Sequence, residues 1–240
     1  MRNIGFTLSL IILTVATANA QIAIEGGLNM SNMSIKEADT KLATKFRTGG
    51  AVGIVGDLSF NEHVYFQPGL FYQTAGCVIT GPPSGEYDLN TITIPLNIEY
   101  KAGEKCNSRF FAGAGPYVCK NLSGTFSRDS YGPVPSSSGS LNIGTDIKAL
   151  DLGLGVNVGY QIKKHFYFRL HYQVGLTNLD ASGDSKNSTK TSAIGFTMGF
   201  LFGGCRNSGD SFFRNSPSHW RGIKKGKHSQ KALNYHKAWL

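Results

Sequence analysis

The chain has 240 residues and a net charge of +9, and charged residues make up 16% of it, well below the roughly 25% usual for soluble domains. Its 30 glycines and 11% aromatic residues exclude disorder over most of the chain and disfavour a helical bundle. Beyond the first 20 residues no apolar stretch approaches the length of a spanning helix. The composition therefore predicts an all-β protein, either soluble or crossing a membrane with strands.

The N-terminus has the pattern of a secretory signal peptide. A short basic start, residues 1–3, precedes an apolar run from Ile4 to Val15, and Ala18-Asn19-Ala20 matches the small-x-small cleavage pattern. An N-terminal anchor helix is the alternative, but the apolar run is short for one. We expect residues 1–20 to be removed and the mature chain to begin at Gln21, outside the cytoplasm.

After Gln21, eight segments alternate with the period of two that is typical of strands with unlike faces. Their even-numbered residues are apolar, interrupted by Gly or Pro, and none is charged. The predicted strands are 22–30, 52–60, 64–72, 92–100, 110–118, 150–160, 166–176 and 194–202.

The odd-numbered face decides between a soluble and a membrane barrel. It holds many glycines and few charged residues, unlike a water-facing sheet, where Gly weakens the strands. A narrow lumen filled by small and polar side chains fits it better. The even face carries aromatics near strand ends, typical of a girdle at a membrane interface: Phe60, Phe66, Tyr100, Phe110, Tyr160, Phe166, Phe200 and Phe202. The sequence therefore predicts an eight-stranded antiparallel up-and-down transmembrane β-barrel over residues 21–202, embedded in a lipid bilayer.

The connections alternate between short and long, which predicts the orientation. Short connections are expected at 61–63, 102–108 and 163–164, and long ones at 33–45, 80–86, 127–145 and 180–190. Outer-membrane barrels have short periplasmic turns and longer extracellular loops. Both termini of the chain are therefore expected in the periplasm.

Several segments resemble the PorT-like outer-membrane β-barrel family of Gram-negative bacteria. They are Gln67–Tyr72, Ile94–Tyr100, Phe111–Tyr117, Gly153–Gly155 and Tyr172–Asn178. The resemblance covers about residues 21–202 and implies an eight-stranded barrel in the outer membrane. The founding member is associated with type IX protein secretion, but most relatives have no assigned role, so that function is not transferred. Such barrels usually stop at a terminal aromatic residue, whereas 38 residues follow Phe202 here.

Candidate site residues lie on the odd face, toward the predicted periplasmic ends of the strands: Glu25, Asp57, Glu99, Arg169 and His171. A proton path or a small-ligand site is one interpretation. The interpretation we favour is a plug of ion pairs in a narrow lumen, in which the three carboxylates bridge to Arg169. No spacing typical of a metal, cofactor or hydrolase site is present. We expect neither an enzyme nor a general diffusion pore.

Four cysteines in an oxidising compartment allow disulfides. Cys106 and Cys205 fall at the periplasmic end, whereas Cys77 and Cys119 have lumen parity near the outer strand ends. Pairing of Cys106 with Cys205 and of Cys77 with Cys119 is the combination that keeps each pair in one compartment. Free thiols are the open alternative, because sequence does not supply the Cα separation.

Residues 203–240 form a basic tail with eight Lys and Arg against Asp210. A periplasmic end meets no nucleic acid, so disorder or contact with a protein or anionic cell-wall partner is expected. Two functions stay open. One is a structural or surface-binding barrel, and the alternative is an accessory component of a secretion or assembly apparatus.

Overall fold

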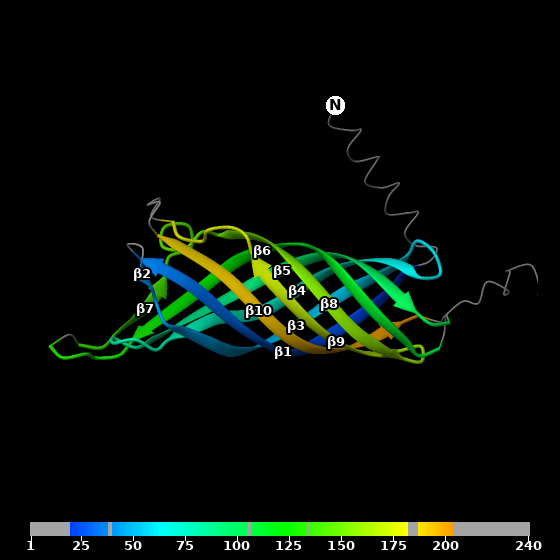
Figure 1. The fold of residues 1–240 in the computed structure, drawn as a ribbon, viewed down its shortest axis with the longest axis horizontal. Coiled ribbons are helices and arrows are strands. Elements are labelled where there is room, and N and C mark those ends of the chain that lie inside the picture. The colour runs from blue at the N-terminus through cyan, green and yellow to red at the C-terminus, as the bar shows by residue number, and fades with distance from the viewer. Residues whose placement is uncertain (1–19, 38–39, 105–106, 134, 182–186, 204–240) are drawn as a thin grey trace, which may run out of the picture. The chain divides into compact units, whose positions relative to one another are not determined.

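The computed structural model describes residues 20–37, 40–104, 107–133, 135–181 and 187–203. Residues 1–19 of the predicted signal peptide, residues 204–240 of the basic tail, and Cys106 and Cys205 lie outside these residues. The described residues form ten strands, which Figure 1 labels. They are β1 (Ala20–Glu37), β2 (Thr40–Lys41), β3 (Thr44–Ser59), β4 (Val64–Ile79), β5 (Gly85–Ala102), β6 (Arg109–Arg128), β7 (Ser137–Leu141), β8 (Leu150–Ile162), β9 (Phe166–Gly175) and β10 (Ser188–Phe202). Among the described residues, no helix is long and apolar enough to cross a bilayer.

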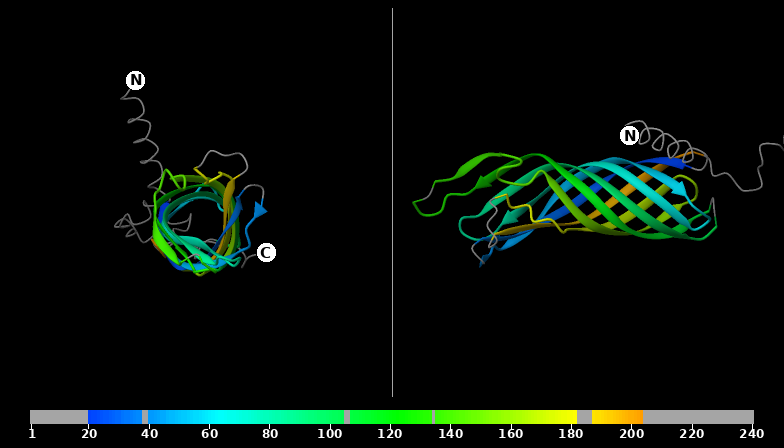
Figure 2. Two further views of the ribbon diagram at one scale, coloured as in Figure 1. Left: turned by 90° about the vertical axis from the view of Figure 1, so that its left-hand side faces the viewer. Right: turned by 90° about the horizontal axis from the view of Figure 1, so that it is seen from above.

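Eight long strands close into an antiparallel barrel, which confirms the predicted fold class. The order around the wall is β1-β3-β4-β5-β6-β8-β9-β10, and β10 pairs with β1 from Ile22↔Phe202 to Lys36↔Ser188. The end-on view in Figure 2 shows the resulting closed ring. Closure pairs the backbone groups that an open sheet edge would expose, which a lipid environment requires.

The short strands β2 and β7 add to the wall at one end of the barrel. β2 pairs with the end of β1, and β7 pairs with Gly124–Arg128 of β6. The β6–β7 hairpin extends beyond the rest of the barrel in Figure 2. At the opposite end the strands are joined by the short connections predicted from the sequence.

Several strands run further toward the β2–β7 end than predicted, which corrects two of the expected loops. β1 continues to Glu37 and β3 begins at Thr44, so most of the expected 33–45 loop is strand. The expected 127–145 loop contains β7. The pattern of apolar even residues missed these extensions because it inverts there.

The inversion is clearest on β1. Up to Met30 the outward residues are apolar and exposed, but beyond it Asn32, Ser34 and Lys36 face outward. The inward residues become apolar over the same stretch, and Met33 and Ile35 are buried. The half of the barrel nearer the short turns, which we call the lower barrel and which includes Ile22–Met30 of β1, is therefore apolar outside and polar inside. The extension toward the β2–β7 end, which begins after Met30 on β1, has the opposite arrangement.

Candidate functional site

The candidate site is the lumen, into which the odd-numbered residues of the long strands project. Arg169 on β9 reaches across it toward β1, β4 and β5. Its Nε lies 3.7 Å from Glu25 Oε1, and its Nη2 lies 3.3 Å from Glu99 Oε1. Nη2 also donates a 2.6 Å hydrogen bond to Gln67 Oε1. The structure thus brings together three of the residues expected in the plug, because alternate residues of a strand face the same side.

Neighbouring side chains complete the surroundings of this cluster. The Tyr167 hydroxyl donates to Glu25 Oε2 at 2.6 Å, and Thr197 donates to Glu25 Oε1. The Arg169 guanidinium carbon lies 5.4 Å from the Tyr167 ring centroid and 5.5 Å from that of Phe111. All of these side chains are buried, so the ion pairs are shielded from water and their partners are specified by geometry.

Asp57 pairs with Lys101, and the expected bridge from Asp57 to Arg169 is wrong. Lys101 Nζ lies 2.8 Å from both Asp57 carboxylate oxygens, and Gln67 Nε2 donates to Asp57 Oδ1 at 2.7 Å. Lys101 also sits 4.3 Å from the Tyr65 ring centroid. Sequence reasoning missed Lys101 because the predicted strand stopped at residue 100. Its odd number was the available signal, since β5 continues to Ala102.

Arg109 and His171 have different surroundings from the paired groups. Arg109 is buried and donates to the Tyr65 hydroxyl at 3.0 Å and to Gln161 Oε1 at 3.2 Å. His171 is half-buried, and its ring occupies the space above Gly195 on β10. It makes no hydrogen bond or ion pair to another described residue. The structure therefore places His171 in the lumen beside the plug but outside its network of ion pairs.

The expected Cys77–Cys119 disulfide is wrong, because both cysteines are buried free thiols. β5 lies between their strands and shows why. Cys77 pairs with Tyr87 of β5 and Cys119 with Thr93, six residues apart, which is roughly 20 Å along a strand. A disulfide needs a Cα separation below about 7 Å. The Cys106–Cys205 pairing lies outside the described residues and stays a prediction.

Inward-facing aromatic rings lie over inward-facing glycines on neighbouring strands. A Cβ on Gly199 would lie 2.1 Å from Tyr167 Cζ, and one on Gly159 would lie 2.2 Å from Phe111 Cζ. Gly53 faces Phe71 in the same way. The lumen glycines therefore make space for rings that fill it, which agrees with a lumen closed by side chains in an eight-stranded barrel.

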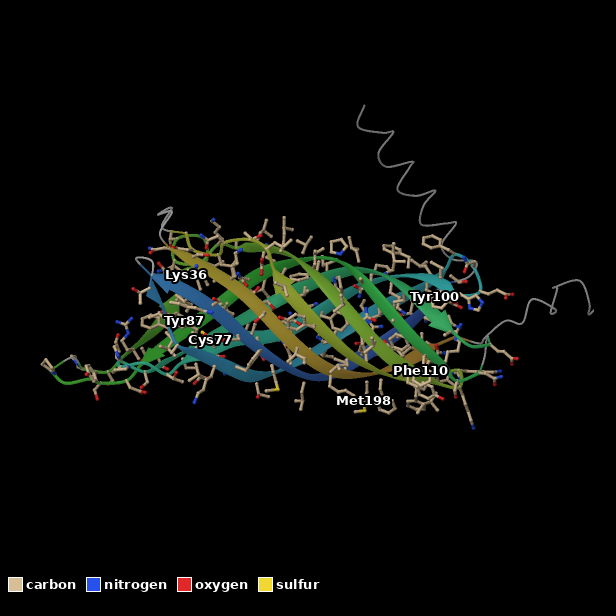
Figure 3. All side chains as sticks on the ribbon, in the orientation of Figure 1. Lys36, Cys77, Tyr87, Tyr100, Phe110 and Met198 are labelled. Atoms are coloured by element: carbon tan, nitrogen blue, oxygen red, sulfur yellow. The ribbon has the colours of Figure 1, made fainter. Side chains whose placement is uncertain are left out.

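The outer surface of the lower barrel is an apolar band with an aromatic edge. Its outward apolar residues extend for about 20 Å along the barrel axis on β1 and about 30 Å on β8, from a 3.3 Å rise and a tilt near 40°. At the short-turn end Phe110 packs on Tyr160 and Phe166 on Phe200. Figure 3 shows Tyr100 and Phe110 at this end, with Met198 pointing away from the wall. Band and girdle match a membrane-spanning wall.

Sequence comparison agrees with this geometry. The family described as outer membrane protein beta-barrel domain matches residues 15–181. The chain belongs to this family. It is therefore an outer-membrane protein, embedded in the lipid bilayer of that membrane. No curated protein has a significantly similar sequence.

Solved structures of outer-membrane barrels are similar to this outer-membrane barrel protein over most of its length. OprG from Pseudomonas aeruginosa is 14% identical with a TM-score of 0.45, and the match covers 78% of this chain and 97% of OprG. Neisserial surface protein A is 13% identical, TM-score 0.44, covering 77% and 99%. Ail of Yersinia pestis is 16% identical, TM-score 0.39, covering 77% and 99%. The narrower PorT-like relationship is not tested by these matches and stays a prediction.

The described polar side chains of the lumen form ion pairs and hydrogen bonds with one another. Among the described residues no three His, Cys, Asp or Glu side chains gather into a metal-binding group. The carboxylates near the short-turn end are held by Lys101 and Arg169, which ties together strands that are far apart around the wall. The arrangement is that of a cross-braced, filled barrel.

Proposed function

We propose that the protein is a closed structural barrel that carries a rigid surface-exposed rim for contacts outside the cell, and that it is neither a pore nor an enzyme. The inversion of polarity along the wall is the observation that carries this proposal. On the short-turn side of the inversion, the apolar outer face of the wall suits lipid. On the β2–β7 side of the inversion, Lys36 faces outward, and Met33, Cys77 and Leu89 belong to a buried apolar cluster. A polar outer face around an apolar interior is the arrangement of a barrel surrounded by water.

The rim is the β2–β7 end of the wall, where the ends of β1 and β3–β6 are joined by β2 and β7, so it is built from paired strands as well as loops. Arg47 on β3 makes ion pairs with Glu86 and Asp88 on β5, across the outer face of β4. The hairpin of β6 and β7 extends the wall further (Figure 2). Figure 3 shows Lys36, Cys77 and Tyr87 at this end, opposite Tyr100 and Phe110. Pairing between strands gives the rim a defined surface. The short turns at the other end support a periplasmic location for that end and for both chain termini.

Impermeant maleimide labelling of intact cells tests this orientation. Ser138 on β7 and Lys164 in a short turn are both exposed, so each can be changed to Cys in a background with Cys106→Ser and Cys205→Ser. We expect Ser138→Cys to be labelled on intact cells, and Lys164→Cys to be labelled only after the cells are lysed. Labelling of Lys164→Cys on intact cells would overturn the orientation.

The alternative, an accessory component of a secretion or assembly apparatus, depends on the tail of residues 203–240, of which 204–240 lie outside the described residues. Purification of full-length and tail-truncated protein under identical conditions separates the two proposals. A partner from the export machinery that is captured only with the tail would favour the alternative over a surface role.

A further inference from the structure

A cavity of about 40 Å³ lies in the lumen on the loop side of the Arg169 cluster. Both polar and apolar residues line it, and strands from most of the wall contribute to it. Asn29 on β1, Tyr117 on β6, Asp151 on β8 and Thr191 on β10 all line it. The plug does not use any of these four side chains.

Asp151 is the unusual member of this lining. It is 2% exposed, Thr191 donates to its Oδ2 at 2.6 Å, and its Oδ1 has no hydrogen-bond partner. No Lys, Arg or His is among the residues that line the cavity. Arg169 pairs in register with Gly159, eight residues along β8 from Asp151, which is roughly 26 Å.

Asp151 thus differs from the three carboxylates nearer the short-turn end. Glu25 and Glu99 each contact Arg169, and Asp57 contacts Lys101. Buried charges in proteins are normally paired or bound to a metal, because an isolated buried charge is strongly unfavourable. Asp151 has no ion pair with a described Lys, Arg or His, so either a bound cation or a proton neutralises it.

The unsatisfied atoms around this cavity show what it would accept. Asn29 is 1% exposed, and its Oδ1, like Asp151 Oδ1, has no partner. Both atoms are acceptors. A second lumen cavity of about 30 Å³ differs, because Asn157 Nδ2 and Arg169 Nε leave donors unsatisfied there beside the Asn157 acceptor. Mixed demand suits water, which donates and accepts. Two acceptors alone could each accept a hydrogen from one water, so the feature that favours a cation here is the Asp151 carboxylate without an ion pair.

We propose that the cavity beside Asp151 binds one hard, oxygen-coordinated metal cation, with Asp151 and Asn29 as ligands. Carboxylate, amide carbonyl and hydroxyl oxygens are the ligands of such cations. The volume accommodates a cation with one or two waters. A single carboxylate implies weak affinity, for Ca²⁺ on the order of 10⁻⁴–10⁻³ M. The bound cation links β1 to β8 and stabilises the outer half of the lumen.

Thermal unfolding of the full-length protein in detergent micelles tests the proposal. Met33 and Leu89 of the buried apolar cluster also line the cavity and could slow the entry of a cation into the folded barrel. The protein is therefore refolded in the presence of each salt. CaCl₂, NaCl and tetramethylammonium chloride at equal ionic strength separate a divalent, a monovalent and an excluded cation. We expect Ca²⁺ or Na⁺ to raise the unfolding midpoint by about 5 °C near a hundredfold excess over Kd.

Asp151→Asn and Asp129→Asn form a matched pair of variants. The cation response should disappear in Asp151→Asn and persist in Asp129→Asn, since Asp129 is exposed and bonded to Ser84. Equilibrium dialysis with ⁴⁵Ca²⁺ or ²²Na⁺ should find about one ion per barrel, lost in Asp151→Asn. If Asp151→Asn does not fold, Asn29→Leu with the same dialysis replaces it.

Two results would overturn the site. One is an equal midpoint for the wild type in all three salts. The other is a wild type that is stabilised by lower pH but by no cation, because a proton would then neutralise Asp151. Neither result bears on the orientation test, so the two proposals fail independently.

Discussion

Removing Lys101 should leave Asp57 as an uncompensated charge inside the barrel. Both side chains are 2% exposed, and Lys101 Nζ bonds both Asp57 oxygens at 2.8 Å. Breaking a buried ion pair from one side costs about 3–5 kcal/mol. Gln67 still donates to Asp57 in Lys101→Met, so we expect the lower end, about 3 kcal/mol of lost unfolding free energy.

A double-mutant cycle measures this interaction directly. Lys101→Met, Asp57→Leu and the double variant are unfolded with urea in lipid vesicles and followed by circular dichroism. The double variant should lie within about 1 kcal/mol of the wild type, because an apolar pair replaces an ionic pair at little net cost. The coupling energy between the two positions should therefore exceed about 2 kcal/mol.

Glu86→Gln provides the control at the exposed rim. Glu86 pairs with Arg47, but its side chain is 43% exposed, and exposed ion pairs contribute less than about 1 kcal/mol. A coupling energy near zero between Lys101 and Asp57, or an effect of Glu86→Gln equal to that of Lys101→Met, would refute the reasoning that burial makes the lumen pairs matter.

Four further outcomes are expected. Leu154→Arg, on the outward face of β8, should destabilise the barrel in the membrane by about 2–4 kcal/mol. The fraction of folded barrel should fall accordingly, as measured by heat-modifiability on gels. Gly199→Ala should lower stability by about 1–3 kcal/mol through its clash with Tyr167, whereas Gly81→Ala, with nothing within 4 Å of the new Cβ, should leave the urea midpoint unchanged. Truncation after Phe202 should leave protease-resistant barrel in the membrane, and loss of that barrel would show that the tail guides assembly. Purified protein in planar bilayers should give no stable conductance steps, and large reproducible steps would refute the filled lumen.

The sequence was enough for the lower barrel because one physical rule governs each residue there. A strand between lipid and a narrow lumen alternates strictly, so the apolar residues at 22–30 and 150–160 were recognisable one by one. The same rule assigned Glu25, Glu99 and Arg169 to the lumen. It placed them on a face without showing which side chains would meet.

Partner choice depends on register and on distance around the ring, which sequence patterns do not contain. Asp57 pairs with Lys101 rather than with Arg169 because β3 and β5 bring these two side chains to the short-turn end, on either side of β4. Cys77 and Cys119 share a face but lie too far apart along their strands to bond.

The length of the strands was also decided by the tertiary structure. Beyond Met30 the polarity of the wall inverts, so that apolar Met33 is buried in the lumen and Lys36 faces outward. A search for apolar even positions ends there, although the strand continues. The sequence by itself determined which residues face lipid, because that surrounding imposes one polarity on every outward residue. Strand length, ion-pair partners and the isolation of Asp151 emerged from closure of the ring, since each depends on what the neighbouring strands bring to the same level.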